Sequence, residues 1–159
     1  MARPILLNSC ARATTSAEAR FRIDYPLAPA RATRVVALDD YAKAVVRQAA
    51  DEPWAQARFF TVAEAGHELL TLDGVVSPLS GELEGVGTLV LVATSGENAQ
   101  AAATIGEACS MRGVMTAGLV LSHGDFTSDA LLALRPYARI LLVPAEPDDL
   151  IELLRAIRA

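Results

Sequence analysis

The chain has 159 residues, of which 52% are apolar and only 5% aromatic, and its formal net charge is −5. This length fits one compact domain, and the composition is typical of a globular α/β protein rather than of a disordered or collagen-like chain. The longest strongly apolar run, Thr88–Ala93, is far shorter than the ~18 residues of a membrane-spanning helix. The composition therefore predicts no membrane span and no membrane partner.

Charge is distributed unevenly along the chain. Residues 1–34 hold six arginines and two acidic residues, a local net charge of +4, which leaves −9 for the residues that follow. An acidic body repels nucleic acid, so we expect no such partner. The Arg-rich segment is compatible with an organelle transit peptide and with an arm that adds a strand to a sheet edge, and a cytoplasmic location is the default expectation.

Only two cysteines, Cys10 and Cys109, are present, so neither a disulfide framework nor a metal site is predicted. Cys109 falls on the apolar face of a predicted helix and is expected to be a buried small residue. No cofactor is expected either.

From residue 34 onward, turn residues and changes of hydrophobic period divide the chain into alternating strands and helices. Strands are predicted at residues 34–38, 58–62, 88–93, 115–121 and 139–143. Helices are predicted at residues 40–51, 63–70, 97–112 and 128–135 and from Pro147 onward, the first with Tyr41, Ala44, Val45 and Gln48 on one face. The glycine-containing stretch 71–87 is predicted to be a loop with one short strand.

Apolar strands that alternate with helices predict an α/β, three-layer, doubly wound parallel sheet of about five core strands, which is a Rossmann-like fold. We expect residues 34–159 to form a single domain and residues 1–33 an N-terminal arm. If the strand order is 2-1-3-4-5, the chain reverses direction between the strands at 34–38 and 88–93, and a ligand would bind beside them at the carboxyl ends of the strands.

Polar residues follow three of these strands and form the candidate binding site. They are Asp39, Asp40, Thr94, Ser95, Gly96, Glu97, Asn98, Ser122 and Asp125. Hydroxyls beside a glycine at a helix start can cradle an anion, but a capping role for Ser95 explains the same pattern. Asp39 and Asp40 similarly fit either helix capping or a carboxylate pair for Mg²⁺ or acid–base work.

The two histidines, His67 and His123, are the remaining candidates for chemistry. His67 has Glu64 and Glu68 nearby and is expected on the surface. His123 follows the fourth predicted strand, where it would be either a proton carrier or a solvated loop residue, and it is the one weak catalytic candidate. No serine elbow, Walker loop or Gly-x-Gly-x-x-Gly motif occurs, so an enzyme is not favoured.

The order of segments over residues 34–147 resembles the nucleotide-binding domain of FtsZ and tubulin. The closest pieces are 108–122, similar to the helix, glycine and strand that follow the glycine-rich loop of FtsZ, and 139–144, similar to its next strand. The resemblance implies a GTP-binding fold. Its first loop is here Leu38-Asp39-Asp40-Tyr41, and its glycine-rich loop keeps one glycine at 93–99, which implies that the nucleotide chemistry is lost.

Two shorter resemblances compete with this one. Thr94–Asn98, followed by a helix and Arg112–Thr116, is similar to the SIS domain of phosphosugar isomerases, which implies a sugar phosphate on the Ser/Thr loop. Asp39-Asp40, Ser122 and Pro144 are similar to a response-regulator receiver, but Ala93 or Thr94 stands at the phospho-acceptor position and Val143 replaces the usual lysine. The latter resemblance therefore implies no phosphotransfer.

Taken together, these features predict a non-catalytic binding or regulatory domain. The alternative is a small-anion site, for a phosphosugar or a nucleotide such as GTP, at Thr94–Asn98. A protein partner or a homodimer is also expected, because Pro4–Leu7 and Phe21–Tyr25 are strand-like and can pair with a sheet edge.

Overall fold

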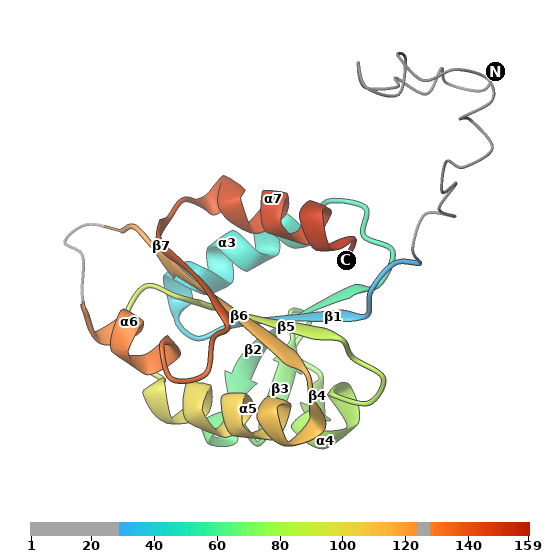
Figure 1. Ribbon diagram of the computed structural model, residues 1–159, viewed down its shortest axis with the longest axis horizontal. Helices are drawn as coiled ribbons and strands as arrows, with labels where there is room; N and C mark the ends of the chain where they lie inside the picture. Colours follow the sequence, from blue (N-terminus) through green and yellow to red (C-terminus); the bar gives the residue numbers. More distant parts are fainter. Residues whose placement is uncertain (1–28, 124–127) are drawn as a thin grey trace, which may run out of the picture.

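Seven strands form one sheet in the order β4-β3-β2-β1-β5-β6-β7 in the computed structural model, which describes residues 29–123 and 128–159 (Figure 1). The strands are β1 (Thr33–Ala37), β2 (Ala57–Ala63), β3 (Glu68–Thr71), β4 (Val76–Pro78), β5 (Thr88–Ala93), β6 (Met115–Leu121) and β7 (Ile140–Ala145). The helices are α3 (Asp40–Ala50), the 3-10 turn η1 (Glu64–Gly66), α4 (Leu79–Glu82), α5 (Ala99–Arg112), α6 (Ser128–Leu134) and α7 (Pro147–Ile157). The fold is α/β and Rossmann-like, as the sequence predicts.

The five long strands are parallel and run in the order β2-β1-β5-β6-β7. Val35 of β1 pairs with Phe59 on one side and with Val90 on the other, so β1 lies at the centre of this region. The chain moves outward from β1 to β2 and then crosses back to β5. The predicted order 2-1-3-4-5 is confirmed for the parallel strands, and the switch point lies between β1 and β5.

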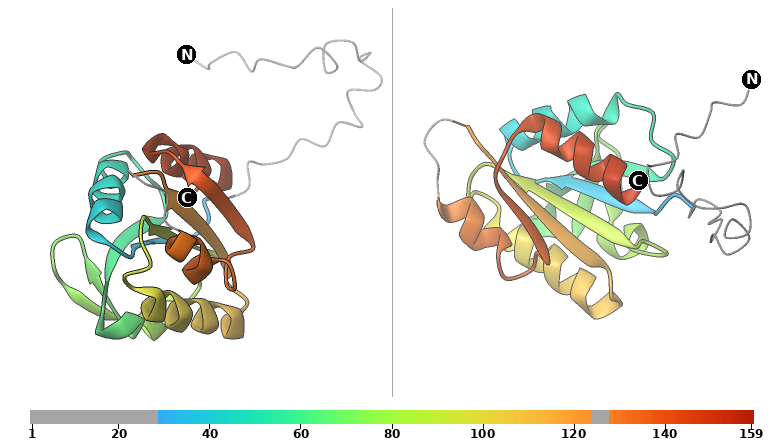
Figure 2. Two further views of the ribbon diagram at one scale, coloured as in Figure 1. Left: turned by 90° about the vertical axis from the view of Figure 1, so that its left-hand side faces the viewer. Right: turned by 45° about the horizontal axis from the view of Figure 1, so that its top comes forward.

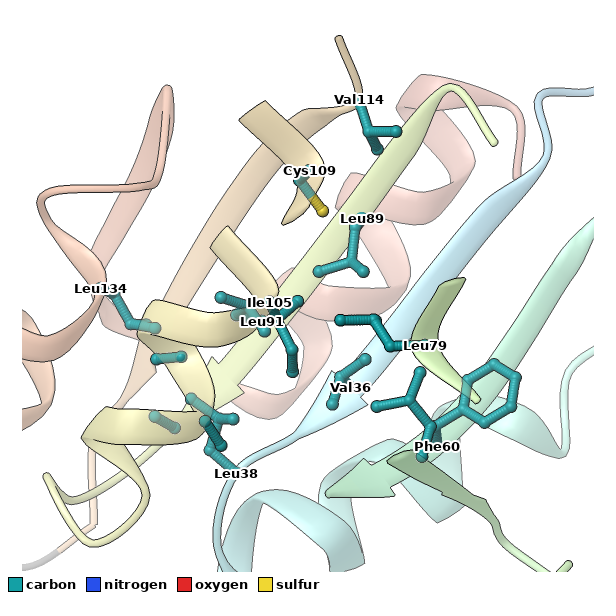
Figure 3. Close-up of a cluster of buried hydrophobic side chains, with 14 of the residues drawn as sticks. Val36, Leu38, Phe60, Leu79, Leu89, Leu91, Ile105, Cys109, Val114 and Leu134 are labelled. Atoms are coloured by element: carbon teal, nitrogen blue, oxygen red, sulfur yellow. The ribbon is translucent and has the colours of Figure 1, made fainter. Parts of the chain in front are cut away.

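Helices cover both faces of the sheet, which gives the three expected layers (Figure 1). On one face α3 and α7 pack over Val35, Ala37, Val90 and Val92. On the other, α5 and α6 pack over the residues between them, including Val36, Leu89 and Leu91, with Ile105 of α5 at the centre (Figure 3). Both faces of the central strands are therefore buried, which is why these strands are apolar throughout rather than alternating.

The helix predicted at residues 63–70 is wrong, because this segment is a 3-10 turn followed by β3. Gly66 has φ +91°, and a Cβ at this position would lie 2.8 Å from the carbonyl oxygen of Ala101, so the turn presses against α5. Residues 68–71 then pair antiparallel with β2, and β4 pairs antiparallel with β3. This hairpin extends the sheet at the edge opposite β7 (Figure 2).

The buried face of α3 also differs from the prediction. The buried residues are Ala42, Val45, Val46 and Ala49, whereas Ala44 and Gln48 are exposed. Alanines at the first and last of these positions let the helix approach the sheet closely, a preference that a search for large apolar residues does not detect. The strand-like pieces Pro4–Leu7 and Phe21–Tyr25 lie outside the described residues.

A buried ionic cluster joins the amino ends of β1 and β2 to α4. The Glu82 carboxylate accepts hydrogen bonds from Arg34 Nε at 3.1 Å, Arg58 Nη1 at 2.9 Å and the Ser77 hydroxyl at 2.7 Å. The side chains of Glu82 and Arg34 are only 6% and 11% exposed. The cluster thus fastens the short helix α4 and strand β4 to the parallel sheet.

Cys109 is fully buried on α5, as predicted, and burial raises the pKa of its thiol, an effect that a hydrogen bond with Thr116 and the charge of Arg112 partly oppose. The unfolded chain therefore loses this proton at lower pH than the folded chain. The thiol's contribution to stability is intact below about pH 8.5, the ordinary cysteine pKa, and is lost as the pH rises through the raised value.

We expect the free energy of unfolding of a Cys10→Ser variant, measured by urea denaturation, to fall more steeply between pH 8 and pH 10 than that of Cys10→Ser/Cys109→Ala. The double variant titrates the same lysine and tyrosine side chains and so serves as the matched control. Parallel pH profiles of the two variants would contradict the prediction.

Candidate functional site

Asp39 occupies the switch point and connects the loops after β1 and β5. It is the N-cap of α3, where its Oδ1 accepts a hydrogen bond from the Ala42 amide at 2.9 Å and another from the Thr94 hydroxyl at 2.7 Å. Its Oδ2 accepts from the amides of Thr94 at 2.6 Å and Ser95 at 3.2 Å. A carboxylate has about four acceptor positions, so those of Asp39 are all in use within the chain.

The loop 94–98 turns inward toward Asp39 and β1 at several points. Besides the two amides that Asp39 holds, the Asn98 side-chain amide donates to the Leu38 carbonyl, and the Ser95 hydroxyl accepts from the Glu97 amide at 3.3 Å. Helix α5 begins at Ala99 with Asn98 as its N-cap, so the expectation that Ser95 caps this helix is wrong. The donors that would form an anion cradle at Thr94 and Ser95 therefore already have intramolecular acceptors.

A hollow of about 190 Å³ opens beside Asp39 at the carboxyl edge of the sheet. It is lined by Ala37, Leu38, Asp39, Asp40, Lys43, Thr61, Val62, Leu70, Glu97 and Asn98. Three carboxylates stand against one ammonium group in this lining. The hollow is acidic and therefore repels a phosphate that arrives without a metal ion.

Gly96 lies on the far side of the same loop, against α6. A Cβ at Gly96 would lie 2.8 Å from the Cβ of Asp129, so the loop and the first turn of α6 are in close contact. A wider, shallow hollow of about 590 Å³ lies here and includes Ser95, Glu97, Asp129 and the exposed Leu132. Its two carboxylates are also unsuited to an anion.

His123 stacks on Tyr41 across the carboxyl edge, with ring centroids 3.8 Å apart and an angle of 24° between the planes. The contact joins the loop after β6 to the first turn of α3. Ser122, the residue before it, is exposed and donates its amide to the Ala145 carbonyl at 2.8 Å. Asp125 lies outside the described residues. His67, predicted on the surface, is exposed.

The candidate residues that the structure describes after β1 and β5 lie close together, and Ser122 and His123 follow β6 at the same edge. Tyr41, Lys43 and Thr61 also lie there and were not predicted as site residues. Lys43 had a usable signal, since it follows Asp40 by three residues and so shares its side of α3. Thr61 had none, because its position depends on how β2 pairs with β1.

Within residues 29–123 and 128–159, no group of three or more His, Cys, Asp or Glu side chains is placed to hold a metal ion. The same part of the chain contains no helix with the length and apolar character needed to cross a membrane. Comparisons with protein-family models, curated proteins and solved structures found no match. What this chain shares with the families it resembles in sequence is thus stated at the level of an α/β fold with a mostly parallel sheet.

Proposed function

We propose that this protein is a non-catalytic binding or regulatory domain on a Rossmann-like fold. The observation that carries the proposal is the saturation of Asp39, the carboxylate at the switch point. Its four hydrogen bonds fix the loops after β1 and β5 relative to each other. A carboxylate that abstracts protons or coordinates a metal needs a free acceptor position, and Asp39 has used its positions for structure.

The electrostatics of the hollow support the same proposal over the phosphosugar or nucleotide alternative. Asp40 and Glu97 are exposed at its rim, and Lys43 is the single cation in its lining. Phosphate sites use free amides at a helix start or an excess of cations. This loop instead presents carboxylates, and its Thr94 and Ser95 amides are already bound to Asp39.

Exposed apolar side chains at both edges of the sheet favour a protein as the partner. Val75 and Val76 of the β3–β4 hairpin are 62% and 53% exposed, and Ile140 at the start of β7 is 41% exposed. Apolar side chains gathered at a sheet edge are common where another chain docks. Light scattering on the full chain tests whether this partner is a second copy, which would give twice the monomer mass.

Thermal unfolding with GTP, ATP and a hexose phosphate, each with and without Mg²⁺, tests the proposal directly. We expect no saturable rise in the melting temperature and no hydrolysis of either nucleotide. A ligand at 100 times its Kd would stabilise the fold by about 2.7 kcal/mol, so binding would be detected easily. Saturable stabilisation together with nucleotide turnover would refute the proposal, whereas stabilisation by the hexose phosphate alone would establish the alternative.

A further inference from the structure

A separate cavity of about 220 Å³ lies at the amino edge of the sheet, opposite the switch point. It is enclosed by the last turns of α5, the turn that leads into β6, and the connection from α6 to β7. Its polar lining consists of Ser110, Thr116, Tyr137 and Arg139, and Gly106 and Gly113 complete the wall.

The backbone around this cavity is held in place by close packing. A Cβ at Gly106 would lie 2.4 Å from Cγ of Tyr137, so the absence of a side chain on α5 is what admits the tyrosine. Gly113, with φ +68°, ends α5, and the Arg139 amide donates to the Thr116 carbonyl at 2.8 Å. The cavity is consequently a preformed feature of the fold rather than a gap between loose loops.

The side chains in this cavity are donors without acceptors. Among the described residues, no carboxylate lies within 4 Å of the Arg139 guanidinium, and the Ser110 and Tyr137 hydroxyls form no side-chain hydrogen bond. None of the lining residues is acidic, although the two hollows at the carboxyl edge contain carboxylates. An uncompensated arginine beside two hydroxyls is the donor set that recognises an oxyanion.

We propose that this cavity binds a small organic monocarboxylate, with its carboxylate on Arg139 and its apolar part against Val114 and Met115. The cavity is smaller than the roughly 300 Å³ at which pockets for drug-sized ligands begin, so the ligand is of fragment size. A single guanidinium balances one negative charge. The partial negative charge at the end of α5 and the acidic body disfavour a dianion such as phosphate.

Titration of the full-length protein with benzoate, followed by the amide NMR signals of residues 106–116, tests the proposal. Benzamide has the same shape without the charge, butyrate replaces the ring with a short chain, and inorganic phosphate tests for a general anion site. We expect saturable shifts with a carboxylate and none with benzamide. Arg139→Met should weaken carboxylate binding at least about tenfold, because it removes a charged hydrogen-bond donor but keeps the length of the side chain.

Arg135→Met is the matched control, since Arg135 is exposed at the end of α6 and does not line the cavity. Its carboxylate affinity should equal that of the unmodified protein, and the melting temperatures of both variants report whether they fold. Absence of shifts with both benzoate and butyrate would overturn the proposal, as would equal affinity of Arg139→Met or tighter binding of phosphate. The result is independent of whether the carboxyl edge binds a nucleotide.

Discussion

Replacing Glu82 by alanine is expected to lower the free energy of unfolding by about 3–5 kcal/mol, because it removes one partner from a buried ion pair. Arg34, whose side chain is only 11% exposed, would then keep its charge without the carboxylate. Burial already lowers the pKa of Arg34 through loss of hydration, and Glu82 offsets part of that penalty. Urea denaturation followed by circular dichroism measures the change.

Glu84→Ala is the matched control, since Glu84 is exposed two residues further along the chain. Its effect should stay within about 0.5 kcal/mol, as is usual at surface positions. The double variant Arg34→Met/Glu82→Met should recover much of the stability lost in Glu82→Ala, because it removes both buried charges and keeps apolar volume. A loss below about 1 kcal/mol in Glu82→Ala would show that water compensates Arg34 and that the cluster is not a fastening point.

The parallel core could be predicted from the sequence because each of its strands carries a local signal. Runs such as Thr88–Ala93 and Met115–Leu121 are apolar throughout and bounded by polar or glycine-containing turns, and both strands begin and end where predicted. Burial on both faces requires that pattern wherever helices cover both sides of a sheet. The strand order then followed from the short connections and the usual handedness of the crossovers.

The β3–β4 hairpin could not be predicted, because its strands depend on their neighbours rather than on their own residues. Glu68–Thr71 contains two adjacent leucines, which fit a short helix equally well, and Val76–Pro78 has three residues. β3 is defined by its antiparallel pairing with β2, and β4 by its pairing with β3. Segments of this length show too little periodicity to distinguish helix from strand.

Glu82 and Asp39 illustrate a second limit, which concerns polar side chains. Glu82 stands in a stretch with several glycines and looks like a solvated loop residue, and its partners Arg34 and Arg58 are distant in sequence. Asp39 was predicted both as a helix cap and as a site residue. The cap is confirmed, but the hydrogen bonds to Thr94 and Ser95 join positions more than fifty residues apart and follow from the sheet order alone.

Asp39→Ala is the second substitution with a large expected effect, a loss of about 3–4 kcal/mol of unfolding free energy, because it removes an N-cap and three further hydrogen bonds to a charged acceptor. Asp40→Ala, at the exposed neighbouring carboxylate, should cost less than about 1 kcal/mol. Both variants remove one negative charge from the same helix start. The difference between them therefore measures the hydrogen bonds of Asp39 rather than its charge.

Asp39→Asn separates these hydrogen bonds further, since the amide keeps the shape of the side chain but turns one acceptor oxygen into a donor. That nitrogen would face either the amides of Thr94 and Ser95 or the amide of Ala42 and the hydroxyl of Thr94. A hydroxyl can rotate to accept, whereas an amide N–H cannot, so the asparagine should place its nitrogen toward Thr94 Oγ1 and lose the cap at Ala42. We therefore expect a stability between those of Asp39→Ala and the unmodified chain. Equal stabilities for Asp39→Ala and Asp40→Ala would instead mean that Asp39 is not needed to hold the two loops, and its carboxylate would again be available for chemistry.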